Sequence, residues 1–320
     1  MRVALPLLLA LAAPAGAETI YISDEAGTAV HVVDGATLRE TGRIEVGKRP
    51  RGIGLSPDGK ILYVAVSDDN RIVAVDRATG TVRIALDNVP DPETFALSPD
   101  GARMYIANED DSQLSIADLT SGKVVTEVPV GAEPEGTAVS PDGSLVVQSS
   151  ESASMAHVVD SASGKVIGNL LVDTRPRFVA FTPDGKQFWV SSELRGTVTV
   201  FDAATRKKIG VIDFSDLGRG KSAEELVQPV GIAFTRDGRR AFVALGRSKL
   251  VAEVDPATRA IVRTWPAGWR AWNLSLSPDE KRLYTANGLS ADMTAIDLVT
   301  NQVLATVALG GKPWGIVAAP

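Results

Sequence analysis

Charged and aromatic residues stand on both sides of a proline that recurs along the chain. The prolines lie at positions 50, 92, 134, 176, 229 and 313, and Ala271 takes the same place in one unit. The preceding residues are Arg49, Asp91, Glu133, Arg175, Gln228, Arg270 and Lys312, and the following ones are Arg51, Glu93, Glu135, Arg177, Val230, Trp272 and Trp314. Arginine offers a planar fork of donors to carboxylates, and tryptophan offers a flat face to a ring. These residue types predict a charged and aromatic site wherever the units converge.

The chemistry of this site has several open interpretations. Arg51 with Glu93, and Glu135 with Arg177, could be ion pairs between neighbouring units, because buried charges must be paired. The two tryptophans could plug a channel or line a ligand site, since concave and partly apolar places with convergent polar groups bind ligands. The candidate ligand-binding residues are Arg49, Arg51, Glu93, Glu135, Arg175, Arg177, Arg270, Trp272, Lys312 and Trp314. No catalytic residue and no metal ligand is assigned from the sequence.

The elements that position these residues follow from a 42-residue repeat. Turns of the type SPDG recur at 56–59, 98–101, 140–143, 182–185, 235–238 and 277–280. Aspartates at 34, 76, 118, 160, 202, 255 and 297 keep the same period, apart from one step that is 11 residues longer. Both markers place an insertion at about 213–229, which could be a lid, a docking element or ornament. Turn chemistry explains the recurring aspartates without any functional role.

Each unit predicts four short strands, because runs rich in Val, Ile, Leu and Tyr alternate with turns that carry Pro, Asp and Gly. Four-stranded units of this length, repeated radially, make an all-β propeller. Residues 19–45 supply three strands of a unit, and residues 314–319 supply its missing first strand. The sequence therefore predicts a single seven-bladed domain over 18–320, closed by three N-terminal strands and one C-terminal strand.

The first 17 residues are set apart from this domain. They hold Arg2, an apolar run from Val3 to Ala13 and the small residues Ala15-Gly16-Ala17, which is the layout of a secretory signal peptide. We expect cleavage after Ala17 and a periplasmic protein with no membrane insertion, because the apolar run is too short to span a bilayer. The chain has no cysteine, which excludes disulfides, thiol catalysis and thiolate metal sites. Its net charge of −6 argues against nucleic-acid binding.

The segments RMYIAN at 103–108, RLYTAN at 282–287 and ADLTSGKVVTEVPVGAEPEGTAVSPDG at 117–143 resemble the YVTN-type propeller repeat. The whole of 19–320 resembles in particular the exported propellers encoded beside pyrroloquinoline quinone (PQQ)-dependent alcohol-oxidation genes. That resemblance implies a non-enzymatic binding or scaffold protein of the periplasm. It would bind an anionic ligand or a partner protein at the channel mouth. The partner would be a PQQ-dependent dehydrogenase, a cytochrome or an ABC-transport component. An anionic ligand such as PQQ would bind to the arc formed by Arg49, Arg51, Arg270, Trp272, Lys312 and Trp314. The alternative is a lactonase-like hydrolase that uses the carboxylates Glu93 and Glu135.

Three weaker signals lead to structural interpretations. The loops at 67–70, 108–111 and 149–152 could hold a hard cation, but polar loop tips are usually only solvated. The segment GRGKS at 218–222 lacks the glycine that a phosphate loop needs, since position 215 is Ser. His31 and His157 occupy one strand position three units apart, so they cannot meet in one site. We expect that position to be partly exposed.

Overall fold

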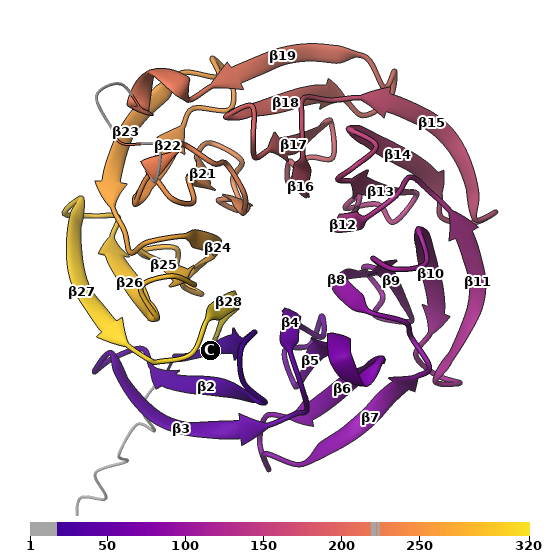
Figure 1. Cartoon of the computed structure of the whole chain (residues 1–320), viewed down its shortest axis with the longest axis horizontal. Helices are drawn as coiled ribbons and strands as arrows, with labels where there is room; N and C mark the ends of the chain where they lie inside the picture. The colour runs from indigo at the N-terminus through magenta and orange to yellow at the C-terminus, as the bar shows by residue number, and fades with distance from the viewer. Residues whose placement is uncertain (1–17, 219–221, 223–224) are drawn as a thin grey trace, which may run out of the picture.

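A computed structural model describes residues 18–218, 222 and 225–320. The predicted signal peptide at 1–17 lies outside the described residues. Within the described ranges the strands form seven four-stranded antiparallel sheets, which are arranged around a central axis like the blades of a propeller (Figure 1). The predicted fold is confirmed. No helix among these residues has the length and hydrophobicity of a membrane span.

Each blade runs from an inner strand at the channel to an outer strand at the rim. The inner strands are β28 (Pro313–Ala319), β4 (Pro50–Leu55), β8 (Pro92–Leu97), β12 (Pro134–Val139), β16 (Pro176–Phe181), β20 (Ile232–Phe234) and β24 (Ala271–Leu276). The second strands are β1 (Thr19–Asp24), β5 (Ile61–Val66), β9 (Arg103–Asn108), β13 (Leu145–Ser150), β17 (Gln187–Ser192), β21 (Ala241–Ala244) and β25 (Arg282–Asn287).

The remaining strands complete the blades toward the rim. The third strands are β2 (Ala29–Asp34), β6 (Arg71–Asp76), β10 (Gln113–Asp118), β14 (Met155–Asp160), β18 (Thr197–Asp202), β22 (Leu250–Val254) and β26 (Asp292–Asp297). The outer strands are β3 (Arg39–Glu45), β7 (Val82–Asp87), β11 (Lys123–Pro129), β15 (Lys165–Leu171), β19 (Lys208–Asp213), β23 (Ile261–Pro266) and β27 (Gln302–Ala308). Two short 3₁₀ turns, η1 (Ser67–Asp69) and η2 (Ser215–Gly218), lie in loops.

The two ends of the chain close the ring as predicted. Strand β28 pairs antiparallel with β1, with Thr19 opposite Ala319 and Ile22 opposite Ile316. The sheet order β28-β1-β2-β3 makes one blade from both ends of the chain, which Figure 1 shows as yellow beside indigo. This pairing occupies the edge of β1 that faces the centre of the ring, so the backbone groups along that edge hydrogen-bond to β28.

The core lies between the blades. Each core cluster combines apolar side chains of neighbouring sheets, for example Trp189 of β17 with Val243 of β21, both fully buried. At the turns, the recurring aspartates accept backbone N–H groups two or three residues ahead, as in Thr37 N–H to Asp34 at 2.7 Å. The hydrogen bond from the Thr37 hydroxyl group to the same carboxylate, together with these backbone bonds, lowers the pKa of Asp34. The structural interpretation of the repeated aspartates is therefore confirmed.

Candidate functional site

The inner strands all begin at the same face of the ring, so the residues beside the recurring proline surround the mouth of the channel. We call the residues after the proline position the hub ring: Arg51, Glu93, Glu135, Arg177, Val230, Trp272 and Trp314. All of them are buried except Trp272, which is partly exposed. The structure thus brings together side chains from seven blades that lie far apart in the sequence.

The predicted ion pairs of the hub ring are present. Arg51 on β4 contacts Glu93 on the next inner strand, and Arg177 on β16 contacts Glu135 on β12. Glu93 is fully buried and also lies 3.6 Å from Arg49. Glu93 therefore lies between two guanidinium groups and Glu135 lies against one, which compensates for the removal of these carboxylates from water.

A second ring of carboxylates surrounds the hub ring, and the sequence interpretation recognised only part of it. Its seven positions lie just after the second strand of each blade and keep the 42-residue period, apart from the one step that is 11 residues longer. Four of them are glutamates, and the full set is Glu25, Ser67, Glu109, Glu151, Glu193, Gly246 and Gly288. Glu109 and Glu151 belong to the loops that were expected to be merely solvated, while Glu25 and Glu193 were missed. Glu25 accepts a hydrogen bond from Arg51 at 2.8 Å, and Glu151 pairs with Arg177 at 2.8 Å. The period itself was the signal that could have found all four glutamates.

Glu193 links two blades of the mouth. Its carboxylate lies 2.7 Å from Arg177 Nε and 2.6 Å from Arg270 Nη1. Burial alone would raise the pKa of Glu193, but Arg270 and Arg177 together hold it below its usual value. Glu193 is therefore ionised at neutral pH and fixes both guanidinium groups.

The residues before the prolines form a more open collar around the hub. Arg49 pairs with Asp91 at 3.1 Å, and Arg175 contacts Glu151. Arg49, Arg175 and Arg270 adopt a left-handed backbone conformation, with φ between 55° and 64°. Lys312 is exposed.

The basic and aromatic arc is packed together. The guanidinium carbon of Arg270 lies 3.9 Å from the ring centroid of Trp272, and that of Arg51 lies 5.3 Å from Trp314. The two indole rings are 6.1 Å apart. A glycine at 288 makes room for this arrangement, because a Cβ there would lie 2.6 Å from the Trp272 indole nitrogen. The two tryptophans thus occupy the part of the mouth where the positions equivalent to the ring of glutamates hold glycine.

Glu135 has the most unusual electrostatic environment of the site. Burial raises the pKa of Glu135 to about 7, although Arg177 and Arg51 favour its ionised form. Glu151 and Glu109 add further negative charge nearby and act in the same direction as burial. A carboxyl group that titrates near neutral pH can accept or donate a proton under physiological conditions.

An open, polar pocket adjoins the hub between the blades of β4 and β8. It has a volume of about 630 Å³, and its lining includes Arg49, Asp91 and Glu109. Asp91, Glu93 and Glu109 bring oxygen atoms within 4.8 Å of one another. Arg49 and Arg51 pair with these carboxylates, so two guanidinium groups offset part of their three negative charges.

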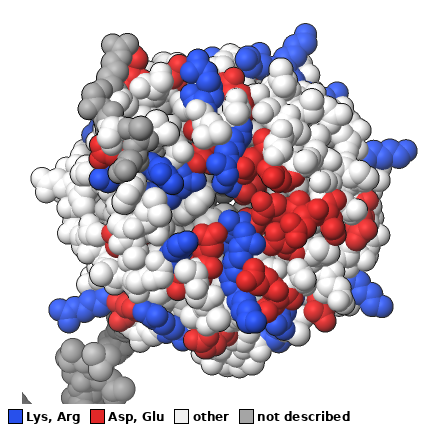
Figure 2. Space-filling model, in the orientation of Figure 1, with Lys and Arg blue, Asp and Glu red and all other residues white. Residues whose placement is uncertain are grey.

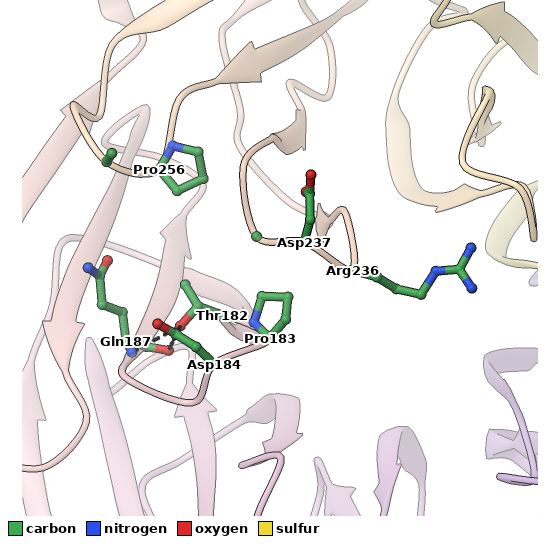
Figure 3. A pocket seen from close by; sticks show the side chains of 9 residues that line it. Thr182, Pro183, Asp184, Gln187, Arg236, Asp237 and Pro256 are labelled. Atoms are coloured by element: carbon green, nitrogen blue, oxygen red, sulfur yellow. Dashed lines mark hydrogen bonds between the residues drawn. The ribbon is translucent and has the colours of Figure 1, made fainter.

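Two other features are explained by the fold. A hollow of about 410 Å³ on the opposite face lies between the turns that contain Asp184 and Asp237 (Figure 3). Within its own turn, Asp184 accepts a hydrogen bond from the Thr182 hydroxyl group, and this bonding pattern recurs at the turns of this type. His31 and His157 are buried and three blades apart, so the expectation of a partly exposed position was wrong. The Nδ1 atom of each histidine hydrogen-bonds to a side chain of the adjacent outer strand, Glu40 on β3 for His31 and Asn169 on β15 for His157.

Comparison with known proteins places this geometry among propellers. A family model described as YNCE-like beta-propeller matches residues 2–110, about a third of the chain. The chain is similar to the YNCE-like β-propellers. No curated protein matches it.

Several solved structures share the fold over most of the chain. Hydrazine synthase of Kuenenia stuttgartiensis is 23% identical, covers 87% of this chain and 92% of its own, and has a TM-score of 0.77. The periplasmic gluconolactonase PpgL of Pseudomonas aeruginosa and a putative 6-phosphogluconolactonase of Bacteroides uniformis are each 18% identical. Both have TM-scores of 0.76, and both cover 95% of this chain and 99% of their own.

These comparisons correct the main functional expectation. The interpretation as a non-enzymatic binding or scaffold protein of PQQ-dependent alcohol oxidation is wrong, because two of the similar structures carry lactonase names. They favour the lactonase alternative, and none of the proteins named above is described in terms of PQQ. At these identities the likeness shows the fold alone, so the activity needs its own argument from the site.

Proposed function

We propose that this protein hydrolyses a lactone at the channel mouth, with Glu135 as the general base. The observation that carries the proposal is a buried carboxyl group with a pKa of about 7 in contact with Arg177. The lactonase names of two proteins with the same fold support it. Glu93 is the weaker choice of base, because it lies between two guanidinium groups, those of Arg49 and Arg51, which favour its ionised form and weaken it as a proton acceptor.

The proposed reaction uses residues of the hub ring. A water molecule attacks the lactone carbonyl carbon while Glu135 accepts one of its protons. When Glu135 takes up the proton it loses its charge, and the guanidinium group of Arg177, partly released from this pair, stabilises the negative oxygen of the tetrahedral intermediate. The ring C–O bond then breaks, and Glu135 returns its proton to the leaving oxygen, which gives the open hydroxy acid.

The surrounding carboxylates keep Arg177 in place for this role. Glu193 and Glu151 both pair with it, at 2.7 Å and 2.8 Å. A donor that is fixed before the reaction needs no reorganisation when charge develops in the transition state. Arg175 has 37% of its side chain exposed and lies on the solvent side of this cluster.

Turnover of a simple lactone tests the proposal. Purified protein should hydrolyse glucono-1,5-lactone faster than the uncatalysed reaction, with kcat/KM rising as pH increases through about 7, because the base must be ionised. Glu135→Gln should lower kcat by about 100-fold or more, which is the usual effect of losing a general base. Glu127→Gln, an exposed change on outer strand β11, is the matched control. Hydrolysis no faster than in buffer would overturn the proposal.

We also propose that the protein works in the periplasm after export. The support is the signal-like layout of residues 1–17 and the periplasmic description of the Pseudomonas aeruginosa protein with the same fold. Expression of the full sequence in a Gram-negative host should give a periplasmic protein that begins at Glu18. N-terminal sequencing of the fractionated protein checks this, and recovery of uncleaved protein from the cytoplasm would contradict it.

A further inference from the structure

The arginines of the mouth are already bound to carboxylates of the protein. Arg51 pairs with Glu93 and Glu25, and Arg270 pairs with Glu193. Arg177 is shared among three glutamates. An incoming anion would have to displace a partner that is itself buried, and breaking a buried ion pair leaves an uncompensated charge.

Carboxylates also outnumber cations around the mouth. Among the described residues of the hub ring, the collar and the carboxylate ring, eight are acidic and six are basic. The acidic ones are Glu25, Asp91, Glu93, Glu109, Glu133, Glu135, Glu151 and Glu193, and the basic ones are Arg49, Arg51, Arg175, Arg177, Arg270 and Lys312. A mouth with this balance repels anions at close range.

The acidic excess extends over the adjoining surface. Four carboxylates, Asp68, Asp91, Glu109 and Asp110, line the open pocket beside the hub, against the two cations Lys48 and Arg49. Figure 2 shows acidic side chains gathered on one side of this face, next to the channel. A ligand that approaches the mouth from that side therefore meets a negative surface.

This arrangement favours ligands that donate hydrogen bonds. An ionised carboxylate only accepts hydrogen bonds, and its bonds from hydroxyl groups are short and strong. A sugar-like lactone offers several hydroxyl donors and carries no charge, so it can bind without displacing any ion pair.

We infer that the mouth selects uncharged, hydroxyl-rich lactones and rejects phosphorylated ones. The inference rests on the proposed lactonase function and adds a substrate class to it. The earlier interpretation of the arginine arc as an anion site is thereby replaced, because each arginine of that arc is paired within the protein.

Three lactones of one ring size test this selectivity. We expect kcat/KM for 6-phosphoglucono-1,5-lactone to be at least about tenfold below that for glucono-1,5-lactone at low ionic strength. The difference in kcat/KM between these two lactones should become smaller as salt is added, because salt screens exposed charges. δ-Valerolactone, which lacks the hydroxyl groups, should also be a poorer substrate than glucono-1,5-lactone.

A charge variant separates electrostatics from fit. The double change Glu109→Gln and Asp110→Asn should narrow the gap between the two gluconolactones at low salt, whereas Glu127→Gln on the outer strand should leave it unchanged. If the phosphorylated lactone or δ-valerolactone were hydrolysed faster than glucono-1,5-lactone, the inference would be overturned, while the proposed lactone hydrolysis itself would stand. Hydrolysis of none of the three would overturn the proposed function and this inference together.

Discussion

At the scale of single residues, Arg177 controls the properties of the site because three glutamates share its charge. Glu135, Glu151 and Glu193 all lie against it. Because this single positive charge is shared among three carboxylates, it offsets the negative charge of each carboxylate only in part. Burial can therefore raise the pKa of Glu135 to about 7 even though a cation touches it.

Removing one of these competitors should change how Glu135 titrates. Glu193→Gln takes away a negative charge and frees Arg177 and Arg270 to act on their other neighbours. The ionised form of Glu135 then becomes more favourable, so its pKa should fall. We expect the rising limb of kcat/KM against pH to move to lower pH in this variant, as measured with glucono-1,5-lactone.

The direction of that change distinguishes positioning from simple loss of structure. A variant that only loosened the mouth would lower activity at every pH and leave the midpoint in place. Glu127→Gln should leave both the midpoint and the rate unchanged. A carbon NMR titration of the Glu135 carboxyl group gives the same pKa without any substrate, and a midpoint that does not fall would contradict this role for Glu193.

At the scale of strands, the inner strands meet through an alternation of small and larger residues. The residues that follow the hub ring are Gly52, Thr94, Gly136, Phe178, Gly231, Asn273 and Gly315. Gly136 lies against the backbone of β16, where an added Cβ would be 2.5 Å from the Arg177 carbonyl oxygen. The glycines thus allow neighbouring inner strands to approach closely, which holds the hub residues near one another.

Substitution of one such glycine should cost stability. We expect Gly136→Ala to lower the free energy of unfolding by about 1–3 kcal/mol, the usual effect of an overpacked site. Gly42→Ala is the matched control, because a Cβ at that position on β3 meets nothing within 4 Å. Its effect should stay within about 0.5 kcal/mol. Denaturant titrations of both variants check this, and equal stability losses would contradict the packing argument.

At the scale of the whole molecule, β28 completes both the fold and the site. It pairs with β1 and also carries Trp314 into the hub ring. It further contacts the neighbouring inner strands, and Asn273 donates a hydrogen bond to the Trp314 carbonyl at 3.1 Å. The same seven residues of β28 therefore join the ends of the ring and close the mouth.

Deletion of residues 313–320 should disrupt this closure. It would expose the edge of β1 and the apolar side chains that β28 covers, and an unpaired edge is prone to associate with other chains. We expect the truncated protein to aggregate and to lose the single cooperative unfolding transition. A chain that lacks only Pro320, which follows β28, should behave like the full protein. Size-exclusion chromatography and thermal unfolding check both, and a monomeric, cooperative truncation would contradict closure by β28.

The sequence alone determined the architecture of this protein. The turn residues and alternating apolar strands repeat with a strict period, so the number of blades and their closure follow from local turn chemistry and counting. The same period correctly placed the hub ring at one face. It also led to the prediction of the two ion pairs, since residues at equal phase in neighbouring units must lie side by side.

Only the tertiary structure decided how these residues share their charges. Spacing along the chain indicates that Glu193 follows a second strand, but not that its carboxylate reaches Arg177 on β16 and Arg270 in the loop before β24. It likewise does not reveal that the arginines are already paired or that burial moves the pKa of Glu135 toward neutral pH. These properties depend on distances and on exclusion of water, and both arise only when seven blades bring their inner ends together.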